Sequence, residues 1–220
     1  TIFHHVSDAR EKIEATDLGS VQSVLLQEVE TVRQSARQAT AISQNLLDLA
    51  RSHTNTKQVA DIPAIMDQSI AQASDLFTDT DGLAFRDIEI RRSYADGLPT
   101  MSCFPAELEQ AFTRVLRSAY YALKAKAGDE ASRSLIHIEI GQFFDSLWIK
   151  VLHKGKPLAA SEQLDIFEPF FVSTSEDGAY PVEHRLSYPY FIITEHHRGH
   201  MSVTSDEQFG TCFNIQLSLV

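Results

Sequence analysis

The sequence is poor in cysteine, glycine and basic residues, and each shortage argues against a class of protein. Its 220 residues include two cysteines, which are too few for a disulfide-stabilised scaffold and fit a reducing compartment. They include only nine glycines, well below the usual share of about 7%, although loops that bind phosphate are normally glycine-rich. With 19 Lys and Arg against 30 Asp and Glu, the net charge of −11 disfavours nucleic acids and anionic membranes as partners.

Long apolar runs are absent as well. No window approaches the roughly 18 consecutive apolar residues that a membrane-spanning helix needs, so we expect no membrane span in this chain. We expect a cytoplasmic protein, because two cysteines fit a reducing compartment. Because the sequence begins at Thr1 without Met, we also consider that it is the cytoplasmic part of a longer protein. The hydrophobic share of 43% is enough to build a buried core.

The clearest periodic pattern runs through residues 18–52. Apolar or small residues recur there at steps of three and four, a stripe typical of a long amphipathic helix. The stripe consists of Leu25, Val29, Val32, Ala36, Ala39, Ile42, Leu46 and Leu49. Residues 2–15 also have helical character, and residues 16–20 are rich in turn formers, so residues 1–54 predict an antiparallel helical hairpin.

The first arm of this hairpin is too short to cover the stripe on the second. The simplest closure is a two-fold, four-helix bundle, so we expect a homodimer through residues 1–54. The alternative is a purely intrachain pair of helices that packs against the rest of the chain.

Residues 55–220 alternate between helical and strand patterns. The expected helices span 61–77, with Asp61 as N-cap, 105–126 and 185–198, and the expected strands span 88–91, 135–141, 146–152, 201–204 and 211–219. This order predicts an α+β fold in which helices cover one face of a sheet.

Short strings along this pattern resemble the core of bacterial sensor histidine kinases. Residues 46–51 are similar to the family's LLDFAR helix ending, and residues 98–111 to the lead-in to its N box. Residues 166–171 read IFEPFF, the family's lid motif, and residues 209–213 resemble its closing GxGTxF strand. The resemblance implies a dimerisation and phosphotransfer-like hairpin over 1–54, followed by an α/β sandwich of the GHKL ATPase type over 55–220.

The resemblance also implies positions for a nucleotide, and the residues there depart from the family pattern. On the helix of the N box, Ser118 stands where an Asn normally helps to hold Mg²⁺, with Tyr121 in the same stretch. Arg114, one turn earlier, replaces an acidic residue, and its positive charge opposes a metal cation.

The two glycine boxes are altered in the same way. His153 stands where the family has an Asp that accepts a hydrogen bond from the adenine amino group, and Gly155 is the one glycine kept nearby. Leu186 lies in the second box, which has lost its glycines, so side chains would obstruct the close approach of phosphate. We therefore expect no cofactor, and ATP with Mg²⁺ only if this alignment is wrong.

A phosphoacceptor histidine is the remaining residue that the resemblance implies. His5 is the first candidate and His4 the second, because an imidazole nitrogen must be unprotonated to attack phosphorus and only these two lie on the first arm. His5 lies closer to the hairpin turn than the family's histidine does, so a phosphoacceptor upstream of Thr1 is the competing interpretation.

The histidines near residue 200 have a spacing that could bind zinc. The set is His196, His197 and His200, with Glu195 nearby. Because Arg198 and Gly199 indicate that a helix ends there, we interpret them as a helix end of the family and expect no metal site.

These observations favour a two-component signalling protein that no longer phosphorylates itself with ATP. As a dimeric pseudokinase or scaffold it would contact a response-regulator receiver domain or another histidine kinase. One alternative is a histidine phosphotransferase of a phosphorelay that uses His5. A second alternative is an active histidine kinase with a divergent ATP pocket.

Overall fold

A computed structural model of the chain describes residues 56–78, 83–126, 134–168 and 186–219, together with 6, 9–11, 13, 24–33, 35–36, 39–40 and 43. The chain divides into two compact units, Thr1–Ala50 and Arg51–Val220.

In the first unit, every described residue is helical. The hydroxyls of Thr31, Ser35 and Thr40 each donate to the carbonyl four residues earlier, at 2.9 Å. A guanidinium nitrogen of Arg10 lies 3.8 Å from a carboxylate oxygen of Glu30, which connects the two helical segments. The predicted turn at 16–20 and the end of the long helix lie outside the described residues, so the hairpin of residues 1–54 stays a prediction.

The second unit is built on a five-stranded sheet. In spatial order its strands are β2 (Glu89–Tyr94), β4 (Leu135–Phe143), β5 (Ser146–His153), β7 (Gly210–Ser218) and β6 (His200–Asp206). β2 runs parallel to β4, and the other neighbours are antiparallel. A separate two-stranded sheet pairs β1 (Gln58–Ala60) with β3 (Met101–Cys103).

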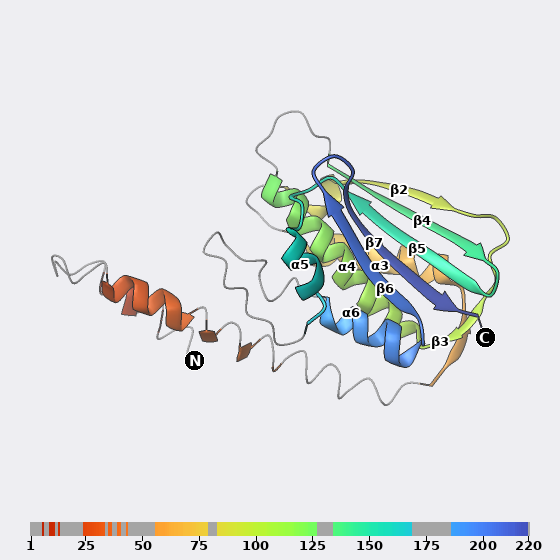
Figure 1. Cartoon of the computed structure of the whole chain (residues 1–220), viewed down its shortest axis with the longest axis horizontal. Coiled ribbons are helices and arrows are strands. Elements are labelled where there is room, and N and C mark those ends of the chain that lie inside the picture. Colours follow the sequence, from red (N-terminus) through yellow and green to blue (C-terminus); the bar gives the residue numbers. More distant parts are fainter. Residues whose placement is uncertain are drawn as a thin grey trace. The chain divides into compact units, whose positions relative to one another are not determined.

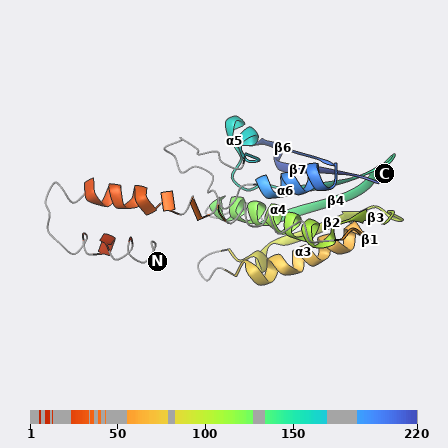
Figure 2. The same ribbon diagram turned by 90° about the horizontal axis from the view of Figure 1, so that it is seen from below.

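The helices cover one face of this sheet. α3 (Ile62–Leu76) and α4 (Pro105–Lys126) lie side by side there, and α6 (Ser187–Phe191) continues directly into the π-helical turn η4 (Ile192–His196) (Figures 1 and 2). The short helix α5 (Ala160–Asp165) follows β5, and the 3₁₀ turn η2 (Phe85–Asp87) precedes β2. Alternate residues of the central strands form the core with the buried face of α4: Ile136, Ile138, Ile140, Leu147, Ile149, Val151, Phe213, Ile215, Leu108, Phe112 and Leu116.

This architecture confirms the predicted α+β fold with helices on one face of a sheet. The strands expected at 88–91, 135–141, 146–152, 201–204 and 211–219 are present with small changes of their ends. β1, β3 and α5 were not predicted. Asp61 occupies the N-cap position of α3, as predicted, and its carboxylate makes no capping hydrogen bond. Among the described helices, none has the length and apolar character to cross a membrane.

Candidate functional site

The end of β5 holds the residue at the predicted adenine position. His153 is 3% exposed, and its Nδ1 accepts a hydrogen bond from the Gly155 N–H at 3.2 Å. The proton of the neutral ring therefore sits on Nε2, which has no hydrogen-bond partner among the described residues. Burial lowers the pKa of His153 to about 4, so the ring is neutral at physiological pH. The position thus offers a fixed, buried N–H donor.

The loop after β5 packs directly on the helix α4. A Cβ at Gly155 would lie 2.4 Å from the carbonyl carbon of Ala122. Any side chain here would therefore force the loop or the helix backbone to move. The neighbouring Lys156 N–H donates to the Ala122 carbonyl at 2.8 Å. Gly155 therefore lets this loop contact the helix backbone, a packing role that explains why a glycine stands here.

On α4 itself, the residues at the predicted Mg²⁺ position are turned to protein contacts. Ser118 is completely buried. The Arg114 guanidinium stacks on the Tyr188 ring of α6, 4.4 Å from its centroid, and the Tyr188 hydroxyl donates to Gln110 Oε1 at 2.8 Å. Tyr121 is half-buried, with its ring centroid 5.0 Å from that of Tyr120.

The second glycine box lies apart from the first. Leu186 precedes α6, is completely buried, and its N–H donates to the Ile166 carbonyl at 2.8 Å. Gly155 therefore packs against α4 beside His153, and Leu186 lies against the end of α5. His5 and His4 lie outside the described residues.

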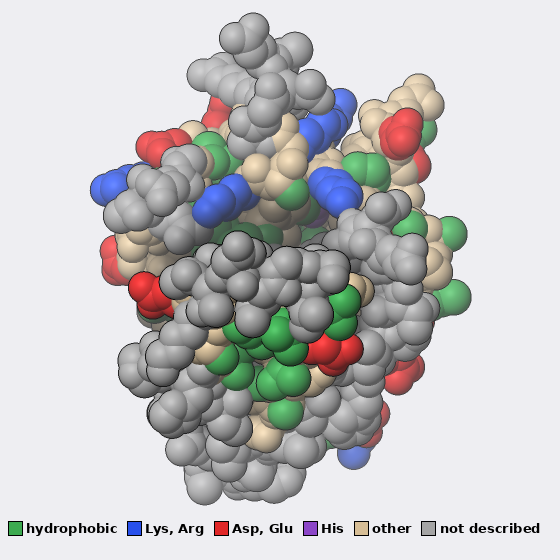
Figure 3. Space-filling model, turned by 90° about the vertical axis from the view of Figure 1, so that its left-hand side faces the viewer, with side chains coloured by type: hydrophobic (Ala, Val, Ile, Leu, Met, Phe, Trp, Pro, Cys, Tyr) green, Lys and Arg blue, Asp and Glu red, His purple; other side chains and the backbone are tan. Residues whose placement is uncertain are grey.

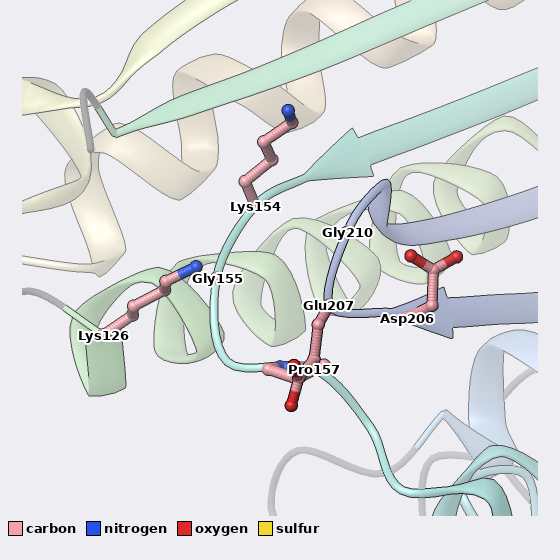
Figure 4. Close-up of a pocket in the computed structure, with 7 residues that line it drawn as sticks. All are labelled: Lys126, Lys154, Gly155, Pro157, Asp206, Glu207 and Gly210. Atoms are coloured by element: carbon pink, nitrogen blue, oxygen red, sulfur yellow. The ribbon is translucent and has the colours of Figure 1, made fainter. Parts of the chain in front are cut away.

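A cavity of about 340 Å³ adjoins the loop after β5 (Figure 4). Its lining consists of Lys126, Lys154, Gly155, Pro157, Asp206, Glu207 and Gly210. In Figure 4 the Lys126 side chain extends from the end of α4 toward Gly155, whereas Lys154 points away from it. Figure 3 shows Lys and Arg side chains beside a hollow on one face of the molecule. The turn between β6 and β7 was predicted from the sequence, but its two acidic residues, Asp206 and Glu207, were not singled out because they belong to none of the recognised motifs.

The histidines after α6 clamp η4 to the start of α4. His197 Nδ1 donates to the Ile192 carbonyl at 2.8 Å, and its Nε2 accepts from the Phe104 N–H at 3.0 Å. Nδ1 of His196 lies 2.7 Å from Oε2 of the buried Glu107. Both ring nitrogens of His197 are therefore engaged within the protein, and the described residues contain no group of three possible metal ligands.

Among known proteins, this chain is similar to solved structures of histidine kinases. No family model matches the chain, and no curated protein matches it. The nucleotide-free catalytic domain of histidine kinase ThkA is similar over 74% of this chain and 95% of its own, with 15% identity and a TM-score of 0.56.

Two longer structures extend the similarity along the chain. Histidine kinase ThkA in complex with response regulator protein TrrA covers 99% of this chain and 59% of its own, with 12% identity and a TM-score of 0.64. Acinetobacter baumannii histidine kinase AdeS covers 100% of this chain and 95% of its own, with 13% identity and a TM-score of 0.57. The chain therefore has the fold of a sensor histidine kinase core, with a GHKL-like second unit.

Proposed function

We propose that this protein is a two-component signalling protein that acts without a nucleotide of its own. It works as a pseudokinase or scaffold, dimerises through residues 1–54, and contacts a response-regulator receiver domain or another histidine kinase. The observation that carries the proposal is that the residues at the expected nucleotide positions make contacts within the protein.

The metal position supports this first. A hard cation such as Mg²⁺ needs oxygen ligands, whereas Arg114 brings a guanidinium that stacks on Tyr188. Ser118 has a single hydroxyl and is completely buried, so it cannot replace an exposed amide oxygen. Binding Mg²⁺ beside this arginine would bring a divalent cation close to a guanidinium cation in a partly buried setting, where the two repel each other.

The base and phosphate positions support it in turn. The Nε2–H of His153 and an adenine amino group are both donors, so they repel where an aspartate would accept. The Leu186 N–H, at the position from which a backbone amide would approach phosphate, is already bound to the Ile166 carbonyl. A nucleotide would have to break these contacts before it could form its own.

The direct test is calorimetric titration of the chain with ATP and with ADP, each with Mg²⁺. We expect no saturable heat and no thermal stabilisation at millimolar nucleotide. A histidine kinase catalytic domain whose ATP binding has been measured under the same conditions serves as the positive control. Saturable binding in the micromolar to millimolar range would overturn the proposal and favour an active kinase with a divergent pocket.

The partner is tested separately. ThkA, to which this chain is similar, has been solved in complex with a response regulator, and this supports a receiver domain as partner. Purified receiver domains from the source organism are screened for binding to the wild-type chain by biolayer interferometry. Binding of one receiver well above the others is expected, and uniform absence of binding would remove this part of the proposal.

A further inference from the structure

The tip of the β4–β5 hairpin carries two exposed aromatic rings. Phe143 is 69% exposed and Phe144 is 80% exposed. Their ring centroids are 4.5 Å apart in an edge-to-face arrangement, so each ring fixes the other. We call this pair the Phe143–Phe144 knuckle.

The backbone at the knuckle is one that disfavours a bulky residue. Phe143 pairs with Ser146, so Phe144 and Asp145 form a two-residue connection between the strands. Phe144 has φ of +50°, a left-handed conformation for which such connections normally use glycine or asparagine. Local turn stability therefore does not account for a phenylalanine at this position, and strained residues of this kind cluster at functional sites.

The knuckle is also held rigid. The side-chain amide of Gln142 donates to the Phe144 carbonyl at 3.0 Å, and the Leu219 N–H donates to the Asp145 carbonyl at 2.8 Å. A rigid, preformed aromatic pair loses little conformational freedom when a partner buries it. Aromatic residues that are buried at low entropic cost contribute much of the binding energy of protein interfaces.

The charges around the knuckle indicate what covers it. Asp145 is exposed within the turn, and Asp96 is exposed just after Ala95, whose N–H donates to the Ile140 carbonyl at 2.9 Å. Residues 94–98 and 141–147 contain no Lys or Arg. An anionic membrane requires cations beside the inserted rings, so an acidic rim favours a protein pocket that is apolar inside and basic at its edge.

We infer that the Phe143–Phe144 knuckle is a contact for the receiver-domain partner, through an apolar pocket with a basic rim on that domain. This inference rests on the proposed function, and it places a contact for the receiver domain on the five-stranded unit. The β6–β7 turn, at the opposite end of the sheet, offers a matched control because Phe209 is 73% exposed there (Figure 1).

The test uses the receiver domain that binds the wild-type chain in the screen. The variants are Phe143→Ser, Phe144→Gly and the control Phe209→Ser, each measured for receiver affinity and for melting temperature. Phe144→Gly should weaken binding about tenfold or more, while its melting temperature does not fall, because glycine accepts the left-handed backbone. Phe209→Ser should stay within about twofold of wild type in affinity, as expected for an exposed residue outside an interface.

The outcomes separate the possible errors. If the wild-type chain binds a receiver and the knuckle variants bind equally well, the knuckle is not the contact. If no receiver binds the wild-type chain, both the proposed partner and this contact are wrong. Two further results would assign the knuckle to a different occupant and overturn the inference. One is a loss of molar mass in Phe144→Gly by light scattering, and the other is binding of the wild-type chain, lost in that variant, to phosphatidylcholine vesicles.

Discussion

At the scale of single residues, His153 stands where the resemblance to histidine kinases implies an aspartate. An aspartate there would present acceptors, whereas this imidazole uses its one acceptor on Gly155 and presents a donor. Burial fixes the neutral form, with a pKa of about 4 against the ordinary 6.5. Between these two pH values the folded state binds fewer protons than the unfolded state at this site.

This difference predicts a loss of stability in acid. The contribution of the neutral ring is fully present above pH 6.5 and is lost as the pH falls toward 4, by an amount on the order of 3 kcal/mol. His153→Asn keeps an oxygen acceptor for the Gly155 N–H and removes the titration. Urea unfolding from pH 7 to about pH 4 should therefore give a flatter stability profile for His153→Asn than for wild type. The exposed His200→Asn should follow wild type, and equal slopes in all three proteins would contradict the assignment.

Motif spacing along the sequence selects candidate positions, but it does not give the contacts that the side chains and backbone groups at those positions make. Ser118, His153 and Leu186 could be placed from their spacing to neighbouring motifs, because motif spacing is local. That Arg114 stacks on Tyr188 could not be predicted, since 74 residues separate them and only the packing of α6 on α4 brings them together. The same holds for the Leu186 N–H, whose acceptor Ile166 belongs to another element.

At the scale of elements, His197 links α4 to η4, alongside the contact between His196 and Glu107. His197 accepts from the Phe104 N–H at the start of α4 and donates to the Ile192 carbonyl of η4, so it satisfies one backbone group on each element. Burial lowers the pKa of His197, which keeps one ring nitrogen free to accept. A π-helical turn such as η4 has poorer internal hydrogen bonding than an α-helix, and an outside partner of this kind compensates for it.

Removal of this joint should destabilise the second unit. His197→Ala leaves the Phe104 N–H without its acceptor, and we expect a loss of roughly 1–3 kcal/mol in the free energy of unfolding. Chemical denaturation measures it. His200→Ala, three residues along on an exposed position, should change stability by no more than about 0.5 kcal/mol. Similar losses in both variants would show that the hydrogen bonds of His197 do not add to the free energy of unfolding of the second unit.

Element length decided which parts of the fold could be predicted. α4 spans 22 residues and repeats its apolar positions often enough for the helical period to stand out. β1 and β3 have three residues each, so no alternation can be read from them, and they form only because their chain segments meet in space. The six-residue α5 was missed for the same reason, because it has too few turns to define a period, whereas α6 and η4 lie within the helix expected at 185–198.

At the scale of the whole molecule, the first unit exposes several large apolar side chains. In the single chain, Val24 is 57% exposed, Leu25 37% and Val32 51%, all on the described helical stretch 24–33. Leu25 and Val32 are one heptad apart in the predicted stripe, so they lie on the same side of the helix. Exposed apolar residues in register along a helix are typical of a coiled-coil or bundle interface.

The proposed homodimer can be tested on this stripe. Leu25→Glu and Val32→Glu place charges at positions that a two-fold bundle would bury, and each should shift the protein from dimer to monomer in sedimentation velocity. Gln27→Glu introduces the same charge at an exposed position on the opposite side of the helix from Leu25 and Val32, and it should leave the dimer intact. Because the substitutions lie in the first unit, the melting transition of the five-stranded unit should be unchanged in all variants. A wild-type chain that sediments as a monomer would favour the intrachain helical pair instead. Stripe variants that remain dimeric would also favour that pair and would place the dimer contact elsewhere on the molecule.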